Sequence, residues 1–255
     1  MGNLEPKGST SAMCPACGRT NFFLRGSPSR TCGFCRCPLD ATPEQVKEHT
    51  TKLAAEKAAD EAEEKRRREE SENKRREEAV REWVDKVAPR RYATASFDRL
   101  PGPLGKTIRE EMNKGNWPYL AGGLGTGKTF VACAIARECL SKGKRVEFAC
   151  VPMLLARIRK AMDEGSGGPE KIVDLMSEID VLVLDDMAAE KASDWVSETM
   201  FRIIDTRYSE LRMTVITSNI MPHEIANERV RSRLCEVVAL IGLTRERPER
   251  SNEAE

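Results

Sequence analysis

The 255-residue sequence predicts an α/β domain around a parallel five-stranded sheet with flanking helices, preceded by a small cysteine-rich module and a long charged helix. Three observations predict this arrangement. Residues 89–243 alternate short apolar runs with amphipathic segments, which is the pattern of βαβ units. Residues 1–40 hold two Cys-x-x-Cys pairs, and residues 41–88 are almost purely charge and alanine. Residues 244–255 form a polar tail that we expect to be disordered.

The composition excludes several classes of function. A formal net charge of +1 gives no global positive field for nucleic acid, so any such binding needs a local basic patch. There is no run of eighteen apolar residues for a transmembrane helix, and Met1–Ser11 lacks the apolar core of a secretory signal. We therefore expect a cytoplasmic protein without a membrane partner. The two histidines, His49 and His223, lie near no candidate nucleophile, which argues against a Ser-His-Asp mechanism.

The first element is a predicted metal module. Cys14-Pro-Ala-Cys17 and Cys32-Gly-Phe-Cys35 form two knuckles with fourteen residues between them. Each turn can place two thiolates on one Zn²⁺, so the four cysteines predict a zinc-ribbon-like module. Without an export signal, metal binding is favoured over disulfides. A redox pair is the alternative, for which one Cys-x-x-Cys would suffice, and Cys37 is an alternative ligand to Cys35.

The surface of this module is rich in arginine. A four-cysteine site is most often structural, and its surface then docks another protein. The alternative is nucleic-acid binding by the arginines around the knuckles, which are Arg19, Arg25, Arg30 and Arg36.

The second element is a predicted single helix over residues 41–88. Glu repeatedly precedes Lys or Arg by four residues, and each such pair contributes roughly 0.2–0.5 kcal/mol. Residues 54–79 contain no Leu, Ile, Val or Phe for a heptad seam, which favours a solvated spacer over a coiled-coil oligomerisation arm. Trp83, Val84 and Val87 restore apolar spacing and predict that the helix docks on the following core there.

The third element alternates predicted strands and helices. The continuous apolar run Val181–Leu184 is typical of a strand that is buried on both faces, as in parallel sheets. The predicted strands are Trp117–Ala121, Val146–Cys150, Val181–Asp185, Thr214–Thr217 and Val237–Leu240. The predicted helices are Thr129–Ser141, Met153–Met162, Glu170–Glu178, Ser193–Leu211 and Ile225–Leu234.

The segment after the first of these strands fits the P-loop pattern G-x-x-x-x-G-K-[ST]. Its residues are Gly122, Gly123, Leu124, Gly125, Thr126, Gly127, Lys128 and Thr129. Glycines let backbone N–H groups curl around phosphate oxygens without a clashing Cβ. We expect Lys128 to reach the β- and γ-phosphates and Thr129 to offer its hydroxyl to Mg²⁺. The loop opens a predicted helix, as phosphate binding requires, so the sequence predicts ATP and Mg²⁺ as ligands.

Two further predicted strands end in polar groups. The strand from Val181 ends in Asp185, which we expect to hold Mg²⁺, and Asp186, which can orient an attacking water. The strand from Thr214 leads to Asn219, which can position water near the γ-phosphate, because strand ends face the ligand in such sheets. Taken without the P-loop, the acids would be ordinary loop residues and Ser-Asn ordinary turn chemistry.

These three elements, in this order and spacing, resemble an AAA+ ATPase and are most similar to the DnaC/DnaI/IstB group of replicative helicase loaders and transposition helper ATPases. The resemblance covers roughly residues 88–243. Pro89–Phe97 is similar to the segment that leads into the family's core, Leu184–Glu190 to its Asp-Asp form of Walker B, and Thr217–Asn219 to sensor 1. The resemblance implies a core without a helical lid, because only a short tail follows the last strand.

The resemblance also implies roles for single residues. Asp186 stands where most AAA+ proteins have Glu, so ATP hydrolysis is expected to be slow. The missing lid implies that a neighbouring subunit completes the site in an ATP-dependent oligomer. Arg233 matches the family's arginine-finger segment, with Arg229 in support. The alternative is a surface ion pair between Arg233 and Glu236.

The implied function is loading of a hexameric replicative helicase onto single-stranded DNA, with the zinc module or the charged helix holding the helicase. Initiator-type AAA+ proteins grip single-stranded DNA with an extra helix after the second strand. Here that place holds Arg157 and Lys160, three residues apart on one helix face, for which a solvated face is the alternative. A transposition helper and an ATP-binding adaptor are the other interpretations. No sequence sign of a metabolic kinase's phosphoacceptor pocket is present.

Overall fold

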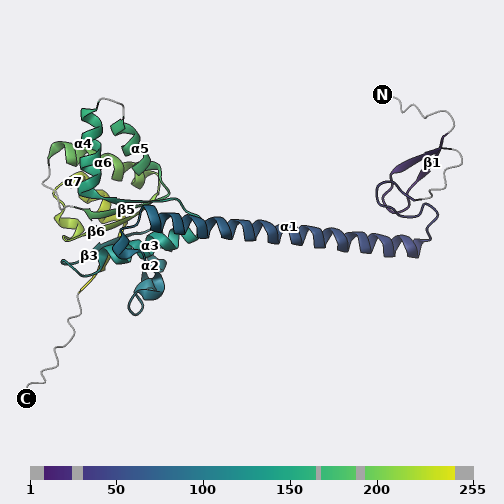
Figure 1. Cartoon of the computed structure of the whole chain (residues 1–255), viewed down its shortest axis with the longest axis horizontal. Coiled ribbons are helices and arrows are strands. Elements are labelled where there is room, and N and C mark those ends of the chain that lie inside the picture. Colours follow the sequence, from purple (N-terminus) through teal and green to yellow (C-terminus); the bar gives the residue numbers. More distant parts are fainter. Residues whose placement is uncertain (1–8, 25–30, 165–167, 188–192, 245–255) are drawn as a thin grey trace, which may run out of the picture. The chain divides into compact units, whose positions relative to one another are not determined.

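The computed structural model describes residues 9–24, 31–164, 168–187 and 193–244 (Figure 1). The chain divides into two units, Met1–Asn73 and Lys74–Glu255, and helix α1 (Pro43–Lys86) runs from the first into the second. Within the described ranges, no helix is long and apolar enough to cross a membrane. All of the predicted tail except Thr244 lies outside these ranges, as do Arg25, Arg30 and Glu190.

The first unit is built around its cysteines. Strand β1 (Ser9–Met13) pairs antiparallel with β2 (Thr20–Leu24), a hairpin that the sequence patterns did not predict. Its core is four buried cysteines, against which a few apolar side chains pack, namely Ala16, Leu39, Ala41, Val46 and Leu53. A core of this size is too small to offset the chain entropy of folding by apolar burial alone, which favours a cross-link.

Helix α1 is continuous from Pro43 to Lys86, as the charge pattern predicted. Ion pairs with Glu on the N-terminal side form at Glu64–Arg68 and Glu82–Lys86, whereas Lys65–Glu69 and Arg66–Glu70 have the opposite order. In the second unit, Trp83 is 5% exposed and packs with the core, and Val84 lies partly buried beside it. The docking prediction is thus confirmed for these two residues. It is wrong for Val87, which is 37% exposed; the next residue, Ala88, is buried in its place.

The second unit contains the predicted sheet of five parallel strands, in the order β4-β5-β6-β3-β7. The strands are β3 (Trp117–Ala121), β4 (Val146–Cys150), β5 (Val181–Met187), β6 (Met213–Ser218) and β7 (Val238–Gly242). The order places β6 between β3 and β5, so the carboxyl ends of these three strands lie together at one edge.

Helices cover both faces of the sheet (Figure 1). They are α2 (Leu104–Asn113), α3 (Lys128–Ser141), α4 (Val151–Asp163), α5 (Gly168–Glu178), α6 (Asp194–Ser209) and α7 (Glu228–Val237), with single turns at Arg90–Tyr92, Phe97–Arg99 and Pro222–Glu224. Leu182 and Leu184 of β5 pack with α4 to α7, and Val183 packs with α2, α3 and the end of α1. This alternation is the two-residue period of a strand buried on both faces.

The predicted α/β fold is therefore confirmed, with differences at element ends. Ser193, predicted as the first residue of a helix, is instead its cap, and the helix predicted from Ile225 begins at Glu228 with Asn227 as its cap. The two cap side chains accept hydrogen bonds from the backbone N–H groups of Val196 and Val230. Such caps satisfy N–H groups that have no partner inside the helix. Helix α2 was not predicted.

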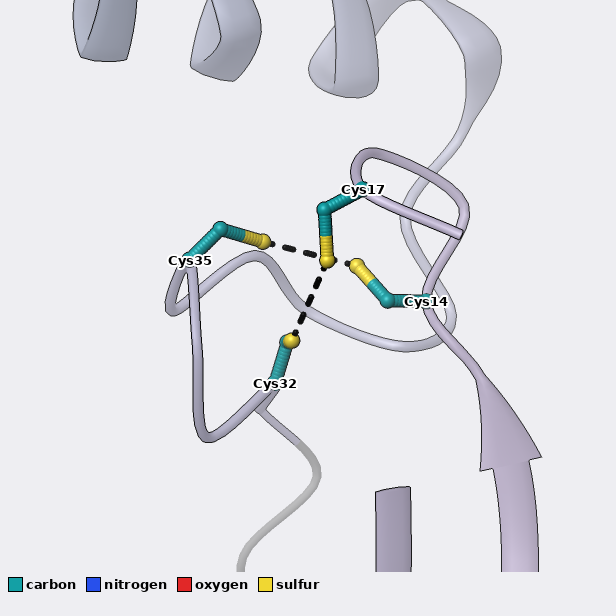
Figure 2. Close-up of side chains that lie close together, drawn as sticks. All are labelled: Cys14, Cys17, Cys32 and Cys35. Carbon is teal, nitrogen blue, oxygen red and sulfur yellow. Dashed lines mark hydrogen bonds between the residues drawn. The ribbon is translucent and has the colours of Figure 1, made fainter. Parts of the chain in front are cut away.

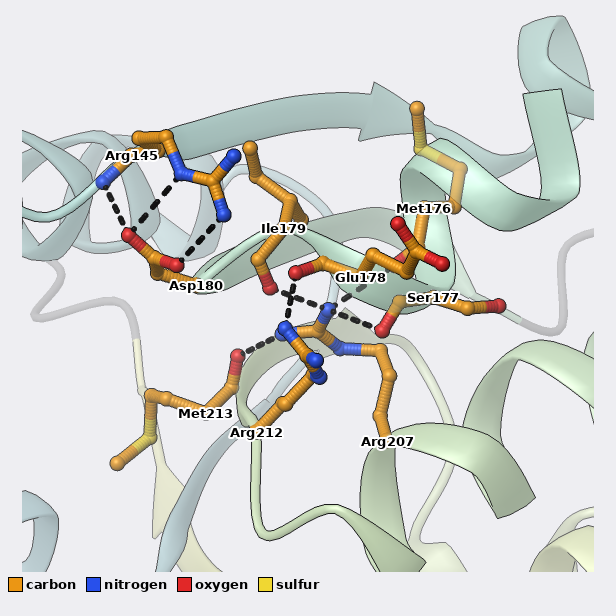
Figure 3. Close-up of polar contacts among 9 residues, drawn as sticks. All are labelled: Arg145, Met176, Ser177, Glu178, Ile179, Asp180, Arg207, Arg212 and Met213. Carbon is orange, nitrogen blue, oxygen red and sulfur yellow. Dashed lines mark hydrogen bonds and ion pairs between the residues drawn. The ribbon is translucent and has the colours of Figure 1, made fainter. Parts of the chain in front are cut away.

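A buried guanidinium joins the opposite edge of the sheet to two helices (Figure 3). Arg207 of α6 is fully buried, and it donates hydrogen bonds to the carbonyls of Met176 and Ile179, at 2.9 and 2.8 Å, and to the Thr214 hydroxyl at 2.8 Å. Burial lowers the pKa of Arg207 to about 9. A nearby ion pair, Arg145–Asp180 at 2.9 Å, lies on the surface of the same edge. These bonds hold the turn between α5 and β5 against β6.

Candidate nucleotide site and metal centre

The P-loop leaves β3 at Ala121 and enters α3 at Lys128. Gly125 and Gly127 have φ of +74° and +90°, which glycine adopts without strain. A Cβ added at Gly123, Gly125 or Gly127 would meet no atom within 4 Å, so the backbone of the loop faces open space. A loop with exposed backbone at a helix N-terminus fits the phosphates of a nucleotide.

At Gly122, a neighbouring backbone segment lies too close for a residue with a side chain. A Cβ there would lie 2.3 Å from the Leu243 carbonyl oxygen, because the chain after β7 returns beside the start of the loop. The Leu243 N–H also donates to the Ala121 carbonyl at 2.7 Å. The C-terminal strand therefore supports the P-loop from the side.

Lys128 brings the P-loop and the end of β6 together. Its side chain is 7% exposed, and Nζ donates hydrogen bonds of 2.8 Å to the carbonyls of Gly122 and Gly123 and to Oδ1 of Asn219. The sequence predicted that both Lys128 and Asn219 face a γ-phosphate, and the structure places them in contact. All three acceptors are neutral, so a phosphate oxygen is a stronger partner for this ammonium group than any it has here.

Asp185 lies at the end of β5 and is 7% exposed. Its Oδ1 accepts hydrogen bonds from the hydroxyls of Thr129 at 3.0 Å and Thr217 at 2.7 Å. Burial raises the pKa of Asp185, and the two hydroxyl bonds act in the opposite direction. A carboxylate beside a P-loop threonine hydroxyl fits Mg²⁺, which prefers oxygen ligands.

Asp186 is exposed, unlike the buried Asp185 beside it. Its backbone has a φ of +58°, which is rare for a residue with a side chain. Its N–H donates to the Thr217 hydroxyl at 2.9 Å. Sequence patterns singled out both acids and Asn219 but gave Thr217 no separate role; only the pairing of β5 with β6 identifies it.

Arg233 and Arg229 lie on α7 and bind residues of α6. The Nε of Arg233 donates to Asp205 at 2.8 Å, and its guanidinium lies over the Tyr208 ring. Arg229 pairs with Glu198 at 3.2 Å. The alternative prediction of a surface ion pair at Arg233 is confirmed, but its partner is Asp205 and not Glu236, which accepts a hydrogen bond from the Tyr208 hydroxyl. Neither arginine bonds to the P-loop among the described residues, so a role in the site depends on another subunit.

Arg157 and Lys160 lie exposed on α4, as predicted for either of their two interpretations. Lys160 makes a weak surface pair with Glu164 at 3.8 Å. Arg159, on the offset face, lies over the ring of Trp195. The described residues therefore leave the Arg157–Lys160 face open to solvent, and its contact with DNA stays a prediction.

The four predicted zinc ligands converge in the first unit (Figure 2). The Sγ atoms of Cys14, Cys17, Cys32 and Cys35 all lie within 4.8 Å of one another, with Cys14–Cys35 at 3.5 Å and Cys17–Cys32 at 3.6 Å. Sulfurs about 2.3 Å from a tetrahedral zinc lie about 3.8 Å apart, so the spacing fits one ion. Backbone hydrogen bonding, chiefly from Cys35, lowers the pKa of Cys32 to about 6, whereas burial raises the pKa of Cys35 to about 12.

The two knuckles share one backbone shape. Gly18 and Arg36 follow them with φ of +69° and +59°, and each donates its N–H to the first cysteine's carbonyl at 2.9 Å. Cys37 therefore occupies the place that Arg19 has in the first knuckle. It is fully buried beside the cluster but is not one of the four converging thiols, so the geometry favours Cys35 as the ligand. His49 of α1 contacts the Cys35 carbonyl at 2.6 Å, a link that sequence patterns missed.

Comparison with known sequences finds a family that is similar to part of the core. Residues 112–227 match the family described as IstB-like ATP binding protein. The chain is 29% identical over 149 residues to an ATP-binding protein of insertion sequence IS1162 from Pseudomonas fluorescens, covering 54% of this chain and 63% of that one. It is 31% identical over 116 residues to the replicative helicase loader DnaI of Bacillus subtilis, covering 45% and 37%. The chain thus spans between about a third and two thirds of these relatives' length.

Solved structures agree on the fold. A crystal structure of the DnaC helicase loader superposes with a TM-score of 0.53 at 28% identity, covering 61% of this chain and 100% of that one. DnaA of Aquifex aeolicus bound to AMPPCP superposes with a TM-score of 0.52 at 19% identity, covering 58% and 50%, which shows the fold alone. The predicted resemblance is confirmed: residues 112–227 match the IstB-like ATP-binding family, and the chain is similar in sequence and fold to the helicase loaders DnaC and DnaI.

Proposed function

We propose that this chain is an ATPase that loads a hexameric replicative helicase onto single-stranded DNA. The observation that carries the proposal is the meeting of Lys128, Asn219 and Asp185 with the P-loop at one edge of the sheet. The helicase as partner is supported by the likeness to DnaC over the whole of a solved chain and by the similarity to DnaI. The converging cysteines offer a separate module for that partner.

Each residue of the site has a chemical role in this proposal. The open backbone of the P-loop and the Lys128 ammonium bind the phosphates of ATP. Thr129 and Asp185 hold Mg²⁺, which when bound neutralises charge on the phosphates. Asn219 and Asp186 orient the attacking water, and Asp186 accepts its proton. Because the Asp186 carboxylate is one methylene shorter than the family's usual Glu, we expect slow hydrolysis.

A second copy of the chain completes the site. Lys128 bonds to the P-loop and to Asn219, whereas Arg233 and Arg229 bond to residues of α6 in the same chain. We assign the role of completing the site to Arg233 of a neighbouring subunit in an ATP-dependent oligomer, with Arg229 in support. Before assembly, the hydrogen bond to Asp205 then fixes the position of the Arg233 guanidinium.

The first unit and α4 supply the remaining contacts of the loader. Zinc held by Cys14, Cys17, Cys32 and Cys35 fixes the small module that binds the helicase or its DNA. Arg157 and Lys160, both exposed on α4, contact the phosphates of single-stranded DNA.

A transposition helper is the second candidate, and the similarity to the IS1162 protein favours it. The two functions differ in their ligands. A loader binds a hexameric helicase and single-stranded DNA, whereas a helper binds long duplex DNA in the presence of ATP. The N-terminal cysteine module favours the loader, since it adds a surface that can bind another protein.

Replacement of Lys128 by alanine is expected to abolish ATP binding. A hydrogen bond to a charged group contributes about 1.5–3 kcal/mol, so losing the ammonium lowers affinity at least about tenfold. Anisotropy of a fluorescent ATP analogue measures this, with Lys106→Ala on exposed α2 as the matched control. Undiminished binding by Lys128→Ala would show that the P-loop assignment is wrong.

The purified chain is expected to carry one zinc. The double change Cys14→Ser with Cys17→Ser removes it because two thiolates are lost, whereas Cys235→Ser, at an exposed position, retains it. ATP-analogue binding survives in the double variant, since the second unit has its own apolar core. Metal analysis that finds no zinc in wild type from metal-sufficient medium contradicts the assignment.

The loader proposal is tested by co-purification with the host's hexameric replicative helicase and by DNA binding with ATP. We expect a helicase complex and preference for single strands. Arg157→Ala with Lys160→Ala should reduce the slope of log affinity against log salt by about 1.4, at roughly 0.7 for each lost phosphate contact. Arg90→Ala with Arg91→Ala is the control pair. Preference for long duplex DNA and no helicase complex would establish the helper instead.

Arg233→Ala is expected to bind ATP and fail to hydrolyse it. An arginine supplied in trans contributes ~10³-fold or more to turnover. Mixing Arg233→Ala with Lys128→Ala should restore part of the hydrolysis, because some interfaces then pair an intact P-loop with an intact Arg233. Arg202→Ala, on the exposed face of α6, is the control. Full ATPase activity of Arg233→Ala alone, at concentrations where wild type assembles, would show that Arg233 is not the residue supplied in trans.

A further inference from the structure

One buried hydroxyl connects the two acids of the nucleotide site. Thr217 lies on β6 with none of its surface exposed. Its Oγ1 donates a hydrogen bond to Oδ1 of Asp185 at 2.7 Å and accepts one from the backbone N–H of Asp186 at 2.9 Å. The same atom therefore contacts the side chain of one acid and the backbone of the next.

An irregularity in the sheet explains why this hydroxyl is needed. Leu184 pairs with Ile216 and Met187 with Ser218, so two residues of β5 lie opposite the single Thr217 of β6. The extra residue is Asp186, which is exposed and has a φ of +58°. Bulges next to active sites re-aim side chains and leave a backbone group without its ladder partner. Here the Thr217 hydroxyl takes the place of that partner.

The single proton of the hydroxyl fixes the direction of these bonds. The Asp186 N–H can only donate, so it uses a lone pair of Oγ1 and leaves the hydroxyl proton for the Asp185 carboxylate. The Thr129 hydroxyl donates to the same Oδ1 at 3.0 Å, whereas its contact with Oδ2 is longer, at 3.4 Å. Two donors therefore hold Oδ1, and Oδ2 is left as the freer acceptor.

We propose that Thr217 is a positioning residue for both acids. It holds the Asp185 carboxylate so that Oδ2 is presented to Mg²⁺ or its water, and it keeps Asp186 in the left-handed conformation that separates a buried acid from an exposed one. The proposal rests on the proposed binding of ATP and Mg²⁺ at this site. It predicts that the Thr217 hydroxyl contributes to Mg²⁺-dependent binding and not to binding of the nucleotide by Lys128.

The neighbouring Ser218 supplies a matched control. It is equally buried at the end of β6, and its hydroxyl donates to the Met187 carbonyl at 2.8 Å without touching either acid. Loss of the Ser218 hydroxyl loosens the same strand pair. A purely structural role for Thr217 would make the two positions equivalent.

The experiment measures the affinity of a fluorescent ATP analogue against Mg²⁺ concentration and in EDTA, together with Mn²⁺ binding by electron paramagnetic resonance in the presence of the analogue. Thr217→Val should weaken apparent metal affinity about ten- to hundredfold, the usual effect of removing a group that orients a metal ligand. Thr217→Ser should restore it to within about threefold, and Ser218→Ala should leave it unchanged. Affinity in EDTA should be the same in all variants.

The outcomes separate this inference from the proposed function. Metal dependence in wild type that Thr217→Val leaves intact, or that Ser218→Ala reduces equally, overturns the role of Thr217 alone. Absence of metal-dependent binding in wild type overturns the proposed function and this inference with it. If Thr217→Val does not fold by circular dichroism, Thr217→Ala, which adds no bulk, is measured against Ser218→Ala in the same way.

Discussion

The buried carboxylate of Asp185 is the constraint on which the arrangement of the site depends. A charge in the interior needs hydrogen-bond donors, and those of Asp185 come from the first turn of α3 and the end of β6. In the observed strand order β5-β6-β3, β6 lies beside both β5 and the strand that leads into α3, which brings Thr217 to Asp185 and Asn219 to Lys128. The order of the strands therefore determines which side chains meet in the site.

Some of the polar groups around Asp185 are bonded to weak partners, so their hydrogen bonds can be exchanged for stronger ones. Lys128 holds three neutral oxygens, which bind an ammonium less strongly than phosphate does. Asp185 uses one oxygen for two hydroxyl groups and keeps the other less occupied. Binding of a nucleotide with its metal can therefore exchange bonds with little movement of the backbone, which the Gly122–Leu243 contact and the Asp186 bulge hold in place.

Different interactions stabilise the two units. The second has two apolar clusters, one on each face of its sheet, and no metal is needed to explain its folding. The first has a core of cysteines with a few small apolar neighbours, and the spacing of four thiols fits one zinc. The apolar core of the second unit therefore does not depend on the cysteine cluster for its stability.

The sequence by itself determined the elements, the P-loop, the paired acids and the four converging cysteines, because each is a local pattern whose period or spacing reflects the geometry it forms. The predicted strands end within two residues of those observed. Only the tertiary structure decided that Thr217 bridges Asp185 and Asp186 and that Arg233 pairs with Asp205 and not Glu236. These depend on strand pairing and helix packing between residues far apart in the chain, which no local pattern records.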